Sequence, residues 1–84
     1  MADTLQLEIA TPERQVASVA VTYATIPGKD GEMGILPGHA ALLSELKKGE
    51  LSYTANGKTE KLIVTGGYVE IRDNHIRVLA DGIE

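Results

Sequence analysis

Hydrophobic and polar residues alternate along much of the chain, and this is the period of half-buried β-strands. Near the start, Leu5, Leu7 and Ile9 alternate with Gln6 and Glu8. Similar β-favouring stretches cover residues 51–55, 58–64, 68–71 and 75–80. The pattern therefore predicts a series of short strands.

Turn-forming residues separate these predicted strands. Asn56-Gly57 is the kind of dipeptide that best predicts a tight two-residue hairpin, and Asp73-Asn74 predicts another turn. Gly66-Gly67 allows a bend or a bulge. Many short strands at this spacing indicate an all-β fold, a flattened antiparallel β-sandwich or barrel.

Two segments leave part of their structure open. Residues 16–26 favour a strand throughout, but either of the two faces of that strand could be the buried one. Residues 40–46 could form one helical turn or a short strand, because a brief apolar run fits both periods. We expect a strand there.

The run of residues 27–40 holds four glycines and two prolines around Met33, Ile35 and Leu36. Because glycine supplies positive φ and proline fixes φ, the run predicts a shaped loop between strands that presents its side chains. Glu32 lies beside the apolar residues, and this combination fits a protein contact surface. The apolar side chains could point outward to a partner or inward to hold the loop.

The glycines of the chain do not predict a phosphate site. Gly28, Gly31 and Gly34 recur every three residues, which does not match the G-x-G-x-x-G spacing. The stretch 57–59 resembles the end of a phosphate-binding loop, but the predicted hairpin explains the same residues. If Gly34 and Gly38 occupy positive φ, a Cβ at either position would strain the run.

Size and composition predict a single domain over residues 1–84. A core without Phe or Trp must be thin and built from Val, Ile, Leu, Ala and Tyr. The net charge of -4, without a long basic cluster, argues against nucleic acid or an anionic lipid surface as the main partner. The lack of cysteine excludes disulfides and thiolate metal sites.

Neither a membrane span nor a secretory signal is predicted. No segment approaches the roughly 20 apolar residues that a spanning helix needs. Residues 1–4 lack the basic and apolar regions of a secretory signal. His39 and His75 lie far apart in the sequence and have neither metal-ligand spacing nor an evident catalytic partner, so we expect no metal site and no active site.

Several blocks of sequence, in the right order and with nearly the right spacing, resemble the N-terminal domain of the epsilon subunit of bacterial F-type ATP synthases. The blocks are residues 31–40, Leu42-Leu43, Leu46-Lys47-x-Gly49, residues 66–71 and residues 78–81. The resemblance runs from about Leu5 to Asp81 and implies a flattened sandwich of two roughly five-stranded sheets.

The resemblance also implies a function. In that family the domain is not catalytic and sits at the foot of the central stalk, bound to the gamma subunit and to the membrane rotor ring. The resemblance therefore implies a rotor subunit that helps couple proton flow to ATP synthesis and needs no cofactor. It also implies a peripheral place at the cytoplasmic face of the bacterial plasma membrane, without direct insertion. We expect the isolated domain to be monomeric.

Contact residues follow from the same resemblance. Glu32, Met33 and Gly34 match the tip that meets the rotor ring. The residues that match the surface facing gamma are Val16, Ala17, His39, Ala40, Leu43, Tyr68, Glu70 and Val78.

The family usually continues after Ala80-Asp81 into a two-helix C-terminal domain. That domain can inhibit ATP hydrolysis and in some members binds ATP. This chain stops at Glu84, so the resemblance leaves open whether it is naturally short or truncated.

Two other classes of function can be tested against a structure. A free-standing β-sandwich that binds a peptide, a carbohydrate or another ligand through residues 27–40 would need a concave pocket, whereas a rotor subunit would show a flat apolar patch near Val16, His39 and Leu43. An enzyme would need His39 within hydrogen-bond reach of a buried carboxylate.

Overall fold

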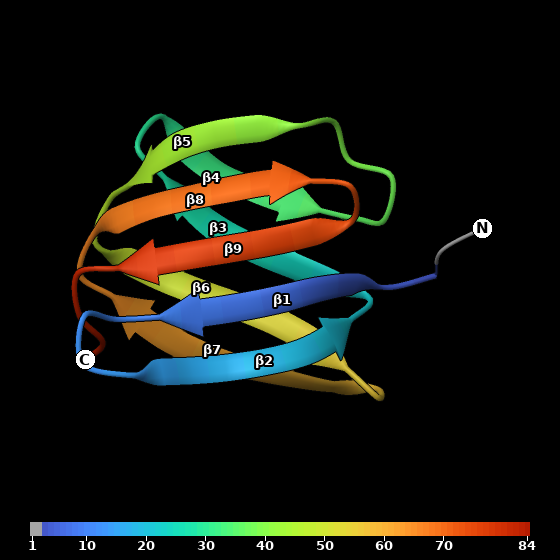
Figure 1. Ribbon diagram of the computed structural model, residues 1–84, viewed down its shortest axis with the longest axis horizontal. Helices are drawn as coiled ribbons and strands as arrows, with labels where there is room; N and C mark the ends of the chain where they lie inside the picture. The colour runs from blue at the N-terminus through green and yellow to red at the C-terminus, as the bar shows by residue number, and fades with distance from the viewer. Residues whose placement is uncertain (1–2) are drawn as a thin grey trace.

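Nine strands make up most of the computed structural model, which describes residues 3–84 (Figure 1). In chain order they are β1 (Leu5–Ala10), β2 (Gln15–Val21), β3 (Tyr23–Gly28), β4 (Gly31–Ile35), β5 (Leu42–Leu46), β6 (Gly49–Ala55), β7 (Lys58–Val64), β8 (Gly67–Arg72) and β9 (His75–Ala80). Met1 and Ala2 lie outside the described residues. They belong to residues 1–4, in which no secretory signal is predicted. Among residues 3–84, no helix is long and apolar enough to cross a membrane.

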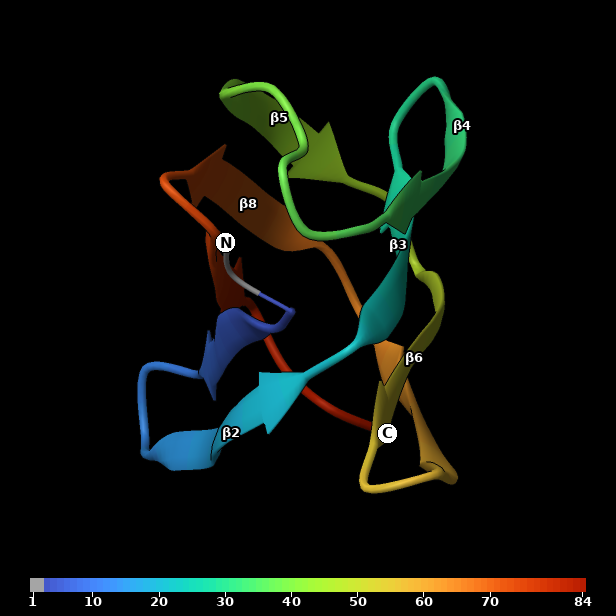
Figure 2. The same ribbon diagram turned by 90° about the vertical axis from the view of Figure 1, so that its right-hand side faces the viewer.

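The strands form two layers that face each other across the core (Figure 2). One layer has the strand order β2-β1-β9-β8-β5, and the other holds β4, β3, β6 and β7. The pairing of Gly28 on β3 with Leu46 on β5 joins the layers along one side. The predictions of an all-β fold and a flattened sandwich are confirmed, with five strands in one layer and four in the other.

One strand pair differs from the antiparallel prediction. β1 and β9 run parallel, with Gln6 opposite His75 and Ala10 opposite Leu79. The two strands lie near opposite ends of the chain, so no hairpin loop joins them and imposes an antiparallel direction. β9 takes its direction from the hairpin that it forms with β8.

Alternate residues on the strands of both layers point inward and form one core. Leu5, Leu7 and Ile9 of β1 are at most 1% exposed, as the alternation predicts. The buried hydrophobic residues are all aliphatic, and they are Leu5, Leu7, Ile9, Val21, Ala24, Ile26, Ile35, Leu46, Leu51, Val64, Val69, Ile71, Ile76, Val78 and Ala80. The two sheets thus pack on each other without an aromatic residue at the centre.

The β-favouring stretch of residues 16–26 is two strands, not one. The chain leaves β2 after Val21 and enters β3 at Tyr23, so it passes from one layer to the other at Thr22. The backbone N–H of Thr22 donates to the carbonyl oxygen of Thr54 at 2.8 Å and holds this crossing in place. Because the chain changes layer here, Val21 and Ala24 both face the core although they lie three positions apart.

The Gly/Pro run is largely a hairpin, and the prediction of a loop between strands is wrong for its first part. β3 continues through Pro27 to Gly28, and β4 begins at Gly31 after a turn at Lys29-Asp30. The ladder between the two strands pairs Pro27 with Glu32. Only residues 36–41 form a connection without strand structure.

The apolar residues of the run divide between core and surface. Ile35 is fully buried, and Met33 is partly buried against the core. Leu36 is 58% exposed. Gly38 has a positive φ of 87°, whereas Gly34 does not, and a Cβ on Gly34 would instead lie 2.7 Å from the hydroxyl of Tyr23.

The predicted turns are present in the structure. Asn56 and Gly57 have φ values of 53° and 77° and join β6 to β7, as expected of a hairpin turn with two left-handed residues. Asp73 and Asn74, with φ values of 51° and 58°, join β8 to β9 in the same way. Residues 42–46 form a strand, as expected.

We predict that Gly67→Ala destabilises the fold more than Gly31→Ala. Both glycines have positive φ, 124° and 141°, so alanine costs roughly 1–3 kcal/mol of backbone strain at either position. A Cβ on Gly67 would also overlap the carbonyl oxygen of Leu79, whereas nothing lies within 4 Å of one on Gly31. Urea denaturation of both variants measures the difference, and equal losses would show that the overlap is relieved without cost.

Candidate functional site

The outer face of the five-stranded layer carries a mixed polar and apolar surface. Here "outer face" means the side chains of β1, β9, β8 and β5 that point away from the core. Strand register places Glu8 beside Arg77, Arg77 beside Glu70, and Glu70 beside Leu43. The adjacent row is Ala10, Leu79, Tyr68 and Glu45. The face is therefore continuous across four hydrogen-bonded strands.

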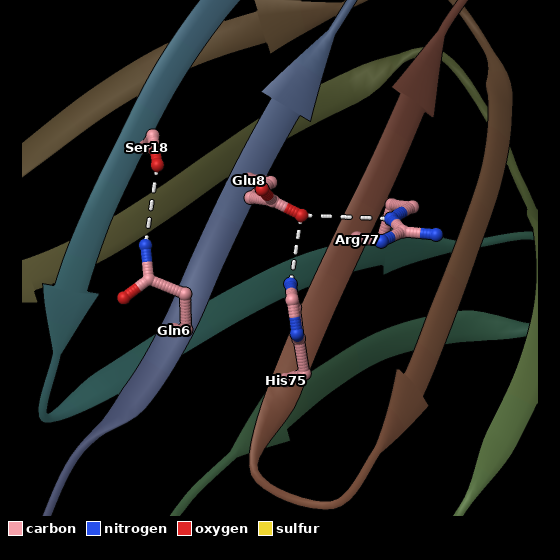
Figure 3. Close-up of polar contacts among 5 residues, drawn as sticks. All are labelled: Gln6, Glu8, Ser18, His75 and Arg77. Atoms are coloured by element: carbon pink, nitrogen blue, oxygen red, sulfur yellow. Dashed lines mark hydrogen bonds and ion pairs between the residues drawn. The ribbon is translucent and has the colours of Figure 1, made fainter.

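A polar cluster of Glu8, His75 and Arg77 lies on the outer face (Figure 3). Oε1 of Glu8 lies 2.7 Å from Nε2 of His75 and 3.5 Å from Nε of Arg77. The hydrogen bond from His75 is the largest cause that lowers the pKa of Glu8, and the charges of His75 and Arg77 lower it further against the opposing effect of burial. The parallel pairing of β1 with β9 makes this cluster, since it sets Glu8 directly opposite Arg77.

The polar cluster does not form the nucleophile and base of a hydrolase. Ser18 is the residue opposite Glu8 on β2, but its hydroxyl accepts a hydrogen bond from Nε2 of Gln6 at 3.2 Å (Figure 3). His75 is bonded to Glu8. A nucleophilic serine would need to lie within hydrogen-bond reach of the histidine.

Apolar side chains lie beside the polar cluster on the outer face. Leu43 is 72% exposed, Tyr68 53% and Leu79 54%. Among the described residues, the other large exposed hydrophobic side chains are Tyr23 and Leu36, which lie elsewhere. Single exposed apolar residues are normal, but three on one sheet face with charges between them resemble a protein contact surface.

The structure brings together part of the predicted gamma-facing set. Leu43, Tyr68 and Glu70 all lie on the outer face. Val16 and Ala17 lie at the start of β2, the edge strand of this layer, and pack partly against the core. Ala17 lies opposite the buried Ile9, so it is on the core side of β2 and does not share the outer face. Contact of these five residues with gamma stays a prediction.

Val78 does not belong to this surface, and its prediction as a contact residue is wrong. Its side chain is fully buried, because it alternates with Arg77 and Leu79 on β9 and points into the core. Leu79 takes the exposed position instead. Strict alternation starting from His75 could have identified Leu79, but the prediction of contacts followed the family resemblance.

His39 and Ala40 lie in the connection of residues 36–41, away from the centre of the outer face. Nδ1 of His39 is 2.7 Å from the carbonyl oxygen of Ala40. Gly38, the preceding residue, donates its backbone N–H to Oδ1 of Asn74 at 2.7 Å, which holds the connection beside the β8–β9 turn. His39 therefore does not show the buried carboxylate partner that an enzyme interpretation needed.

The predicted rotor-ring set lies on β4, just after the β3–β4 turn. Glu32 and Gly34 are exposed, and Met33 points toward the core and is partly buried. The turn itself is Lys29-Asp30, and Nζ of Lys29 forms an ion pair with Glu45 at 3.1 Å. The tip of the hairpin is therefore two residues before Glu32.

The two ends of the Gly/Pro run lie at opposite ends of the molecule. In Figure 1 the β3–β4 turn is at the left end, and the connection of residues 36–41 is at the right end. The longest dimension of the molecule is 33 Å. β4 therefore separates the two predicted contact regions of residues 27–40. The predicted ring-facing residues lie near its start, and the predicted gamma-facing His39 and Ala40 follow its end.

The surface offers little support for a ligand pocket formed by the Gly/Pro run. A shallow hollow on the outer face is lined by Glu70, Arg72, Asp73, His75 and Arg77, and none of these belongs to residues 27–40. Its lining is charged or titratable, whereas small-molecule sites are mostly apolar with a few polar groups. Among residues 3–84, no group of metal-ligating side chains could hold an ion.

We predict that the Glu8–His75 pair makes stability depend on pH on the acid side. Because the folded-state pKa of Glu8 is lowered from 4.5, its ionisation stabilises the fold above that pH, and the contribution is lost as pH falls through the folded pKa. Glu8→Gln should therefore lose less stability than the parent as the pH falls from about 5 to about 3, the range in which glutamate side chains usually titrate. Thermal unfolding across this range measures the slope.

Glu70→Gln is the matched control, because Glu70 lies on the same face. This variant leaves intact the hydrogen bond from His75 that lowers the pKa of Glu8. If Glu70→Gln flattens the acid slope as much as Glu8→Gln does, the role assigned to the Glu8–His75 pair is wrong.

Comparison with known proteins identifies the family. A family model for the β-sandwich domain of the ATP synthase delta/epsilon chain matches residues 4–84. The chain is 49% identical over 84 residues to the ATP synthase epsilon chain of Carboxydothermus hydrogenoformans, with 100% of this chain and 63% of that protein covered. It is 47% identical over 81 residues to that of Pelotomaculum thermopropionicum, with 96% and 60% covered. The chain spans somewhat less than two thirds of these relatives.

Solved structures show the same fold. A chain of the mitochondrial ATP synthase of Euglena gracilis superposes with a TM-score of 0.92 at 22% identity, covering 100% of this chain and 54% of that one. A chain of the central stalk and c-ring of the Tetrahymena thermophila mitochondrial ATP synthase gives 0.80 at 18% identity, covering 95% and 65%. With the match of the family model over residues 4–84, the chain belongs to the family of ATP synthase delta/epsilon-chain β-sandwich domains.

Proposed function

We propose that this chain is a non-catalytic rotor subunit of an F-type ATP synthase. It binds the gamma subunit through the outer face and the rotor ring through the β3–β4 end, and so helps to couple proton flow to ATP synthesis. Its place is peripheral, at the cytoplasmic face of the bacterial plasma membrane, as part of the whole complex. The identity of the relatives as ATP synthase epsilon chains supports this assignment.

The observation that carries the proposal is the group of exposed apolar side chains on the outer face. Leu43, Tyr68 and Leu79 are each more than half exposed. Burying them against a partner removes apolar area from water, and the ion pairs of Glu8 beside them fix the orientation of the partner. The strands that carry them are hydrogen-bonded to one another, so the surface is presented without a large loss of conformational freedom on binding.

The shape of the molecule supports a connecting role. A sandwich of hydrogen-bonded sheets is a stiff body, and its loops can make contacts without disturbing the core. The predicted ring-facing and gamma-facing parts of the Gly/Pro run lie at opposite ends of that body (Figure 1). A part that transmits torque between two partners needs separate contacts on a rigid support.

A free-standing ligand-binding or peptide-binding sandwich is the alternative. It would use the Gly/Pro run as its binding loop, but the first part of that run is a regular hairpin that contributes Ile35 to the core. The hollow on the outer face is lined by other residues. The rotor function therefore accounts for more of the exposed surface.

We predict that Tyr68→Ser weakens binding to the gamma subunit by about fivefold or more, because truncating a central interface aromatic costs more than about 1 kcal/mol. Tyr23→Ser is the matched control, since Tyr23 is 39% exposed on a strand of the other layer. Calorimetric titration of gamma with each variant measures the dissociation constants. Equal weakening by both variants, or no binding by the parent chain, would contradict the proposal.

We also predict that Glu32→Lys weakens assembly with the rotor ring and leaves the melting temperature nearly unchanged. Glu32 is exposed beside the β3–β4 turn, so its side chain adds little to the core and its substitution should change stability little. Glu60→Lys on β7 is the control, because it makes the same charge change at an exposed position of another strand. Co-purification of ring and subunit measures assembly, and a large drop in melting temperature would show that Glu32 is structural.

A further inference from the structure

The connection of residues 36–41 has few ties to the rest of the fold. The backbone N–H of His39 donates to the carbonyl oxygen of Leu36 at 3.1 Å and closes a turn within the connection itself. Among the described residues, the hydrogen bond from Gly38 to Asn74 is the one recorded between this connection and another element. The position of His39 and Ala40 relative to the strands therefore depends strongly on that bond.

The local geometry makes the N–H of Gly38 available. Pro37 and Gly38 occupy the two central positions of the turn that His39 closes, and the φ of Gly38 is 87°. Proline followed by a residue of positive φ is typical of a type II turn. The hydrogen bond of such a turn uses the N–H of the fourth residue, so the N–H of Gly38 is free to donate to an acceptor outside the turn.

Asn74 supplies that acceptor and also anchors the first strand. Its Oδ1 accepts from Gly38 at 2.7 Å, and its backbone carbonyl oxygen accepts from the N–H of Gln6 at 2.9 Å. Its φ is 58°, a left-handed conformation that asparagine tolerates better than most residues. One residue of the β8–β9 turn thus holds both β1 and the connection.

We infer that Asn74 is a positioning residue for the contact between this chain and gamma. Without touching the partner, it fixes His39 and Ala40 beside the end of the outer face, so that the connection and the exposed Leu43 on the following strand present one preformed surface. The inference rests on the proposed function. Its physical basis is that a loop ordered before binding loses less conformational entropy when it binds.

Asn74→Gly tests this inference. Glycine tolerates the left-handed backbone and removes Oδ1, so the tie to Gly38 is lost. Loss of one such hydrogen bond corresponds to a change of about two- to tenfold. We expect amide hydrogen exchange at Gly38 to speed up by about this factor, and the dissociation constant for gamma to rise by about the same factor.

Two further variants separate positioning from a general loss of stability. Asn56→Gly makes the same substitution at a left-handed position of the β6–β7 hairpin and should leave both measurements unchanged. Asn74→Asp keeps a side-chain oxygen acceptor and should retain slow exchange at Gly38.

Unchanged exchange at Gly38 in Asn74→Gly, or equal weakening of gamma binding by Asn56→Gly, would overturn the inference. Failure of the parent chain to bind gamma would overturn the proposed function and the affinity part of the inference. The exchange measurement needs no partner, so it decides separately whether Asn74 holds the connection.

Discussion

The parallel pairing of β1 with β9 is the constraint on which the rest of the structure depends. It joins the first hairpin of the chain to the last one in the middle of the five-stranded layer. With β1 in this register, Leu7 and Ile9 face the core beside Ile76 and Val78. A shift by one residue would turn the apolar side chains of β1 to the solvent, so burial on one face fixes the register firmly.

The same register creates the polar cluster on the opposite side of these strands. Glu8 comes to lie beside Arg77 and within hydrogen-bond distance of His75, although the two strands are separated by most of the chain. Half-exposed ion pairs of this kind contribute little to stability. Their value on a contact surface is that they specify orientation, while the apolar side chains around them supply the driving force for association.

Left-handed turn residues then set the ends of the sandwich. Asp73 and Asn74 reverse the chain tightly between β8 and β9, and Asn74 also ties the connection that leads into β5. At the other end, the turn between β3 and β4 projects beside Glu45 of β5, to which Lys29 is paired. The core and the two ends are therefore parts of one hydrogen-bonded framework, and contacts at either end are made by segments whose positions that framework determines.

The sequence alone determined most of the strands, the tight turns, the aliphatic core and the family, because alternation, turn dipeptides and short sequence blocks are local signals. Tertiary structure alone decided the parallel pair, the layer change at Thr22 and the continuation of β3 into the Gly/Pro run, since each depends on partners distant in the sequence. It also placed Val78 in the core and exposed Leu79. Alternation along β9 separates the side of Val78 from the side of Leu79, and the packing of the strand in the closed sandwich makes the side of Val78 the buried one.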